Sequence, residues 1–234
     1  MKHLKLVALG LGVLLTFSNC GSIQDWSNQT KGTAIGGAGG AVVGGVLGNI
    51  IGKDSKATAI GAAIGAVVGA GAGTLIGNHM DKVAAQTAAQ LPGAQVETVT
   101  DANGLSCVKV TFDSGLMFKT NKYDLNSAAQ TDLAKFASVL KQNSDCSVDI
   151  QGYTDSTGSD AINNPLSVNR AQSVAQYLVG QGVPTTQFKN VSGFGSSNPV
   201  ADNSTEAGRQ KNRRVEVYLY ASQEMIEKAN AGTL

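Results

Sequence analysis

The feature that most limits how this chain can fold is a glycine at every fourth position, in two separate runs. The members are Gly32, Gly36, Gly40, Gly44, Gly48 and Gly52, and then Gly61, Gly65, Gly69, Gly73 and Gly77. A four-residue spacing places such glycines on one face of a helix. Each glycine costs a helix in water about 1 kcal/mol relative to alanine. The helices therefore need close packing against each other, or a membrane around them.

The two glycine runs belong to one repeat, because the pattern that begins at Thr33 returns at Thr58. A polar segment, Lys53-Asp-Ser-Lys56, separates the copies, and each arm has about 20 residues without a charged side chain, enough to cross a hydrocarbon layer of about 30 Å. We predict an α-helical glycine-zipper hairpin at residues 32–79. Membrane insertion and self-association in water both remain open, whereas the interleaved Ile, Val and Leu side chains argue against a flexible linker.

The amino-terminal segment has the layout of an export signal. Lys2 and Lys5 precede a short apolar run that ends near Phe17, and Ser18-Asn19-Cys20 follows. This arrangement resembles a bacterial lipoprotein signal, which implies a signal peptide at 1–19 and lipidation of Cys20. Gly21, rather than Asp, follows this cysteine and resembles an outer-membrane address, with residues 20–31 as the lipidated tether. An uncleaved anchor, or cleavage without lipidation, is the alternative.

From residue 96 the pattern changes to that of a single α+β domain, which we place at 96–222. Residues 80–95 are rich in Ala and Gln and are expected to be a linker, and residues 223–234 a tail. Strands are predicted at 96–100, 106–112, 147–153, 188–194 and 214–220, and helices from residue 127 and over 161–180. Ala128, Leu133, Phe136, Ala137 and Leu140 are expected to form the buried stripe of the first helix.

Composition excludes some partners. With 18 Lys and Arg against 17 Asp and Glu, the net charge is +1, so nucleic acid is not expected as a partner. An exported compartment would permit a disulfide between Cys107 and Cys146, but a pair of buried thiols is an equal alternative.

One charged residue stands where the second helix should be apolar. Arg170 follows Leu166 and precedes Val174 at four-residue intervals, so its guanidinium shares the core-facing stripe. Asp155 follows the strand before this helix, so the two charges can be close in space. They form either a structural salt bridge or a pair held apart to clamp a zwitterion.

At these residues the chain resembles the OmpA-like domain family. Gly152-Tyr-Thr-Asp155, Leu166-Ser-x-x-Arg170, Gly193-Phe-Gly195 and Asn212-Arg-Arg-Val-Glu216 occur in the family's order and spacing. The resemblance covers about half of the chain and implies a βαβαβ mixed sheet with two main helices. Together with the cysteine and the glycine repeat, it resembles the YiaD type of outer-membrane lipoprotein.

The resemblance implies non-covalent binding of peptidoglycan through the diaminopimelate of its stem peptide, which would tether the outer membrane to the cell wall. Asp155 matches the position that receives the ammonium, and Arg170 the position that takes the carboxylate. The further positions that match the family site are Thr154, Asn163, Asn121 and either Arg213 or Arg214. Strand alternation places only one of these two arginines on the cleft face, and we favour Arg213.

We expect neither an enzyme nor a cofactor or metal. The two histidines, His3 and His79, have no cysteine or carboxylate at metal-ligand spacing in the sequence, and no catalytic triad is recognisable. Motor stators also carry OmpA-like domains, but neither apolar arm here contains the carboxylate that proton coupling needs. The alternative function is an accessory protein whose zipper oligomerises or enters a membrane to assist assembly of envelope complexes.

Overall fold

The computed structural model describes residues 60–61, 67–69, 71–119 and 121–234. The predicted signal peptide, the tether with Cys20 and most of the glycine-zipper hairpin lie outside these residues. Among the described residues, no helix is both long enough and apolar enough to cross a membrane.

The domain is built on one five-stranded sheet with the order β1-β2-β5-β3-β4. The strands are β1 (Gln95–Thr100), β2 (Ser106–Asp113), β3 (Cys146–Gly152), β4 (Phe188–Gly193) and β5 (Arg214–Ala221). Strand β5 runs antiparallel to both of its neighbours, and β3 and β4 are parallel. The predicted α+β class and mixed sheet are confirmed, and the last strand of the sequence lies at the centre of the sheet.

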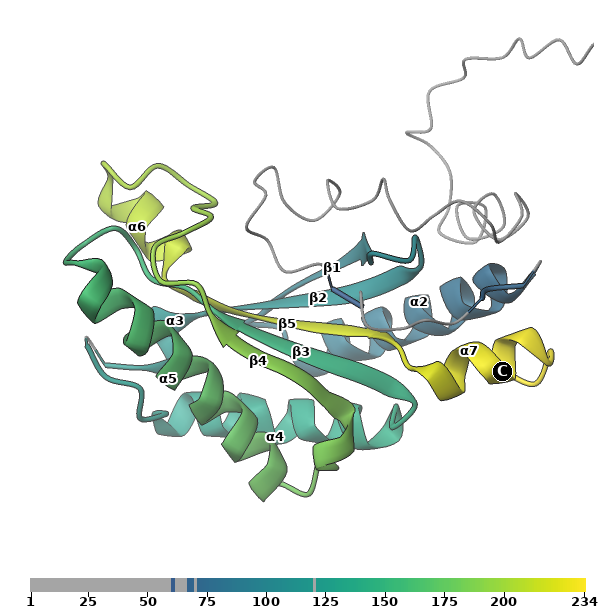
Figure 1. Cartoon of the computed structure of the whole chain (residues 1–234). Coiled ribbons are helices and arrows are strands. Elements are labelled where there is room, and N and C mark those ends of the chain that lie inside the picture. Colours follow the sequence, from purple (N-terminus) through teal and green to yellow (C-terminus); the bar gives the residue numbers. More distant parts are fainter. Residues whose placement is uncertain (1–59, 62–66, 70, 120) are drawn as a thin grey trace, which may run out of the picture.

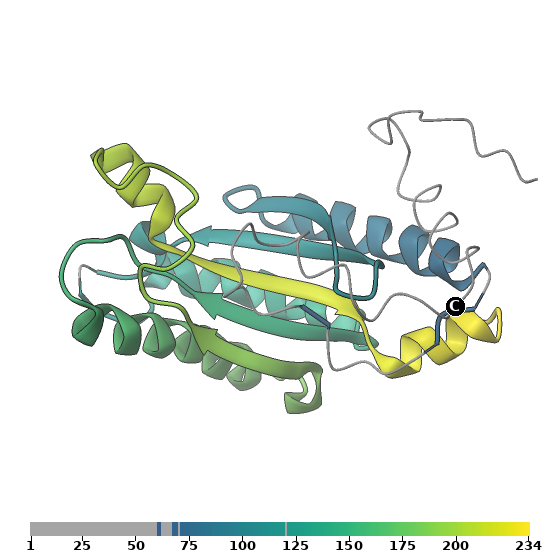
Figure 2. The ribbon, with the colours of Figure 1, turned by 45° about the horizontal axis from the view of Figure 1, so that its top comes forward.

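Three long helices cover one face of the sheet: α2 (Ala72–Gln90), α4 (Ser127–Gln142) and α5 (Asp160–Gly180) (Figure 1). Figure 2, in which the top of Figure 1 is turned forward, shows the other face of the sheet, with α4 and α5 behind it. Alternate residues of β5, namely Val215, Val217 and Leu219, are fully buried in the core beneath the helices. The predicted stripe of α4 is correct except at its first position, where Ala129 is buried and Ala128 is exposed.

Helix α2 differs from the sequence-based boundaries. Residues 80–95 were expected to be a linker, but most of them belong to α2, and Met80 and Val83 are buried in the main core. The predicted glycine-zipper hairpin at 32–79 therefore has its carboxy-terminal boundary inside this helix. The helix begins only after Gly71, whose φ of 90° interrupts helical geometry, and residues 67–69 are not helical. The last glycines of the repeat, Gly73 and Gly77, are buried on α2 within the carboxy-terminal domain.

The predicted tail is also structured, because helix α7 (Gln223–Asn230) packs beside α2. Met225 and Ile226 are buried in the main core, and the Ser222 hydroxyl caps the helix by accepting from the backbone N–H of Met225. Two short helices, α3 (Ser114–Met117) and α6 (Glu206–Asn212), and the 3₁₀ turn η2 (Thr185–Gln187) complete the described elements.

The two cysteines of the domain are free thiols on opposite faces of the sheet. Cys146 belongs to the main core under the helices, whereas Cys107 clusters with Tyr218, Tyr220 and Ile60 on the other face. Since the sheet itself separates them, they cannot be bridged without unfolding. Of the two alternatives left open by the sequence, the structure therefore selects buried thiols.

Candidate functional site

A polar cavity of about 400 Å³ lies where the carboxyl end of β3 meets the first half of α5. All six residues that the sequence singled out for a binding site line it, although they come from distant parts of the chain. The lining is Ser114, Gly115, Phe118, Lys119, Asn121, Thr154, Asp155, Thr157, Asn163, Leu166, Arg170, Glu206, Arg209 and Arg213.

Close contact between α5 and the strands brings the two sides of the cavity together. A side chain at Gly152 would collide with the backbone of Ser167, and one at Gly193 would collide with the backbone of Val168. Glycine at both positions therefore lets α5 lie directly on β3 and β4. The Ser167 hydroxyl accepts from the backbone N–H of Gly195 at 2.9 Å, which fixes the helix against the loop after β4.

Asp155 lines the cavity, and both of its carboxylate oxygens accept hydrogen bonds. Its Oδ2 accepts from Arg213 Nη1 at 2.6 Å, and its Oδ1 accepts from the backbone N–H of Thr157 at 2.7 Å. Burial by itself would raise the pKa of Asp155, but the hydrogen bonds from Arg213 and Thr157 outweigh it and lower the pKa. The carboxylate is thus held ionised, and each oxygen keeps a lone pair for a further donor.

Arg170 does not form the salt bridge with Asp155 that one reading of the sequence allowed. Its Nε donates to the carbonyl of Lys122 at 3.1 Å, and its guanidinium lies 5.2 Å from the ring centroid of Phe118. Arg170 has no ion pair with a carboxylate of the described residues. Burial, followed by repulsion from Arg213, lowers its pKa. The structure therefore holds a buried cation near, but apart from, the anion.

Arg213 is the cation that neutralises Asp155. Besides that bond, its Nη2 donates to Glu206 Oε1 at 2.8 Å, and Glu206 in turn accepts from Arg209. Burial opposes the charge of Arg213, but the two carboxylates prevail and raise its pKa. Its neighbour Arg214 points away, stacks 3.8 Å from the ring centroid of Tyr153 and pairs with Glu216. Arg213 therefore lines the cavity, whereas Arg214 contacts side chains outside it.

Two buried hydroxyls that line the cavity have no hydrogen-bond partner among the described residues. They are the Oγ1 of Thr154 and the Oγ of Ser114. Most buried polar groups in proteins are paired, so such orphans in a cavity point to a polar ligand or ordered water. The side-chain amide of Asn163 donates to the carbonyl of Thr157 at 3.0 Å and so supports the loop around Asp155.

The remaining predicted residue, Asn121, lies on the rim in the loop between α3 and α4. Its φ of 55° is in the left-handed region, which asparagine tolerates better than most residues. The bridge between Phe118 and Leu125 closes the base of this loop. Asn121 is exposed, so its side chain can reach a ligand without first breaking internal contacts.

Several lining residues were not found from the sequence. Ser114 and Phe118 come before the first of the family motifs in the sequence. Glu206 lies on a short helix that hydrophobic periodicity did not predict. A useful signal was present for α6, since Thr205 followed by Glu206 has the character of a helix start, and the Thr205 side chain does accept from the backbone N–H of Gly208.

Comparison with known proteins gives two family matches. Residues 117–213 match the OmpA family, and residues 1–81 match the YMGG-like Gly-zipper. The two matches thus cover separate parts of the chain, each less than half of its length, and the first of them includes most of the strands and helices around the cavity.

Its relatives include two curated proteins. The peptidoglycan-binding protein ArfA of Mycobacterium tuberculosis is 44% identical over 114 residues, which are 49% of this chain and 35% of ArfA. The probable lipoprotein YiaD of Escherichia coli is 34% identical over 141 residues, which are 60% of this chain and 63% of YiaD. The chain therefore spans about a third of the length of the mycobacterial relative and somewhat less than two thirds of the other.

Among solved structures, the chain is similar to the cell wall anchor of the T6SS from Pseudomonas aeruginosa. The TM-score is 0.51 at 25% identity, over 59% of this chain and 97% of the other. The fold that surrounds the cavity is therefore shared with a protein described as a cell wall anchor.

Proposed function

We propose that this protein binds peptidoglycan non-covalently, through the zwitterionic end of a diaminopimelate side chain in the stem peptide. The observation that carries the proposal is the charge arrangement in the cavity. Asp155 is ionised and keeps accepting capacity, while the nearby Arg170 is buried without a carboxylate partner. The ligand's ammonium would donate to Asp155, and the ligand's carboxylate would pair with Arg170, so that both side chains would gain a partner of opposite charge.

The two ends of the ligand would be recognised differently. Guanidinium and carboxylate form planar, two-bonded pairs that are stronger than neutral hydrogen bonds. A lysine-type stem peptide lacks that carboxylate and would leave Arg170 unpaired in the cavity, which costs binding energy. The orphan hydroxyls of Thr154 and Ser114 are available to peptide carbonyl or amide groups. ArfA, which is described as peptidoglycan-binding, supports this assignment by similarity.

We further propose that lipid on Cys20 anchors the chain in the bacterial outer membrane, with the domain in the periplasm. The amino-terminal signal pattern supports this, as does the similarity to YiaD, described as a probable lipoprotein. Such a chain would tether the outer membrane to the wall. Self-association through the glycine zipper is a compatible second contact, because closely spaced small residues favour helix pairing.

Sedimentation with purified sacculi tests the binding proposal. The full chain in detergent should pellet with diaminopimelate-type sacculi, and Asp155→Ala and Arg170→Ala should each lower the bound fraction at least tenfold. Lys135→Ala is the matched control, since Lys135 is exposed on α4 and pairs only with its neighbour Asp132. Undiminished pelleting of both cavity variants would refute the assignment of this site.

A further inference from the structure

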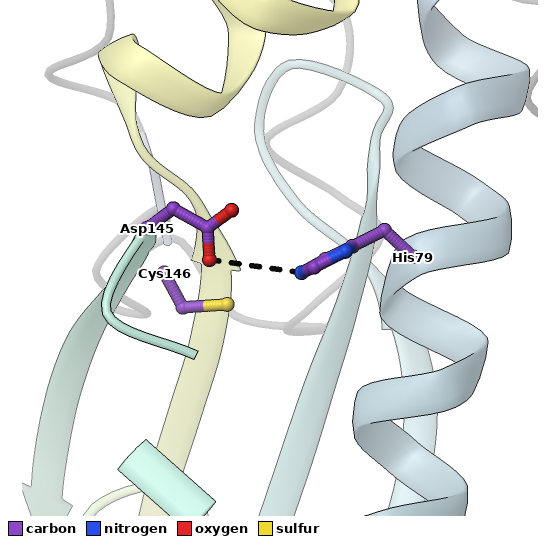
Figure 3. Close-up of side chains that lie close together, drawn as sticks. All are labelled: His79, Asp145 and Cys146. Carbon is purple, nitrogen blue, oxygen red and sulfur yellow. Dashed lines mark ion pairs between the residues drawn. The ribbon is translucent and has the colours of Figure 1, made fainter. Parts of the chain in front are cut away.

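Three potential metal ligands that are distant in the sequence meet at the end of the sheet opposite the cavity. They are His79 on α2, Asp145 in the turn before β3, and Cys146, the first residue of that strand (Figure 3). One ligand atom from each lies within 4.8 Å of the other two. The sequence showed no such grouping, because His79 and Asp145 are 66 positions apart.

The imidazole is incompletely satisfied at this position. His79 Nε2 is buried and has no hydrogen-bond partner among the described residues, and it faces Asp145 Oδ1 at 3.7 Å. That separation is too long for a hydrogen bond. Buried polar atoms are rarely left unpaired, so a group that fits between the nitrogen and the carboxylate would account for both their proximity and their separation.

We propose that His79, Asp145 and Cys146 bind a Zn²⁺ ion. Imidazole, carboxylate and thiolate are the three ligand types that zinc takes in proteins. Metal–ligand distances of about 2.0–2.3 Å place neighbouring donors of a tetrahedral site roughly 3.5 Å apart. The nitrogen and oxygen, 3.7 Å apart, already have nearly this spacing, and the sulfur lies within 4.8 Å of both. The fourth position would be taken by water.

The surroundings are compatible with a cation. On α7, the ammonium group of Lys228 is near enough to attract the Asp145 carboxylate. It pairs with Glu224 at 2.7 Å and so does not occupy the site. Cys146 is fully buried, and burial raises its pKa. Zinc binds the thiolate form of cysteine, so the thiol proton passes to solvent as the zinc–sulfur bond forms and binding releases one proton.

The consequence of such a site would be structural. The ligands come from α2 and from the start of β3, so a bound ion would fasten α2 to the sheet. Because α2 carries the last glycines of the zipper, zinc would stiffen the connection between the zipper and the wall-binding domain. This inference is independent of the proposed peptidoglycan site, whose residues lie at the other end of β3.

Cobalt substitution tests the proposal, because Co²⁺ bound to a thiolate has a sulfur-to-metal charge-transfer band. The full chain with Cys20→Ser, which leaves only Cys107 and Cys146 as thiols, should show this band at one equivalent of Co²⁺ and lose it on addition of Zn²⁺. Cys146→Ala should abolish the band, and His79→Gln should weaken Co²⁺ binding at least tenfold. Cys107→Ala, which removes the thiol on the other face, is the matched control and should keep the band.

A second measurement distinguishes loss of zinc binding from loss of folding. Zn²⁺ should raise the Tm of the parent protein and of Cys107→Ala but not that of Cys146→Ala, whose circular dichroism should remain that of the folded chain. Absence of the band from the parent protein, or its persistence in Cys146→Ala, would overturn the proposal. Sacculus binding unchanged in these variants would show that the zinc site and the wall site are separate.

Discussion

Replacement of Met80 by alanine tests whether α2 is part of the carboxy-terminal domain rather than a connector to it. The Met80 side chain is fully buried between α2 and the rest of the main core. Truncation of a buried methionine to alanine removes its apolar contacts and leaves a cavity, at a cost of about 2–5 kcal/mol. Because alanine favours helices at least as well as methionine, the cost comes from packing and not from helix propensity.

The assay is urea unfolding of the full chain, followed by circular dichroism. We expect Met80→Ala to lower the free energy of unfolding by about 3 kcal/mol without a change in m-value. Lys82→Ala, on the exposed side of the same helix, should change it by less than about 0.5 kcal/mol. If the two variants unfold at the same urea concentration, α2 does not stabilise the domain and the extended boundary is wrong.

Three further predictions concern the cavity and the sheet hairpin. Arg170→Lys should weaken sacculus binding about tenfold, since an ammonium cannot form the planar paired contact; unchanged pelleting would contradict this role. Asn121→Gly, which keeps the left-handed backbone, should weaken pelleting less than Asp155→Ala, and the reverse order would relocate the site. Burial raises the pKa of Asp101 to about 6, against the hydrogen bonds from Leu105 and Asn103. Protonation therefore favours the folded state, and stability is gained as pH falls through 6. Relative to Asp101→Asn, the wild type should gain on the order of 2 kcal/mol between pH 7.5 and 4.5; parallel pH profiles in urea unfolding would refute this.

Much of the domain followed from local patterns in the sequence. Alternation predicted the strands at 96–100 and 106–112, which pair as the β1-β2 hairpin. The helix predicted from residue 127 begins there as α4, where the Asn126 side chain accepts from the backbone N–H of Ala129. These features depend on neighbours in the chain, which is why the sequence reveals them.

The boundaries of the domain were harder to predict, because they depend on tertiary contacts. An Ala- and Gln-rich segment is compatible with a linker or with a helix, and only the core reached by Met80 and Val83 decides between them. The same holds for the carboxy-terminal residues of α7, whose apolar side chains Met225 and Ile226 are few but fully buried.

The six residues that the sequence singled out all line one cavity, but how they pair within it was not predicted. The motif placed Asp155 and Arg170 on facing elements, and both do line one cavity. That Asp155 pairs with Arg213 instead could not be read from spacing, because it depends on how the short helix α6 returns the chain to β5. This pairing matters chemically, since it leaves Arg170 available to a ligand.

Titration of the ¹⁵N-labelled full chain in detergent with two purified stem peptides, one containing diaminopimelate and the other lysine, tests peptidoglycan recognition most directly. We expect the diaminopimelate peptide to shift the amide signals of Asp155, Thr157 and Arg170, and the lysine peptide to shift them little at the same concentration. Equal shifts with both peptides, or none with either, would contradict recognition of a zwitterion by this cavity.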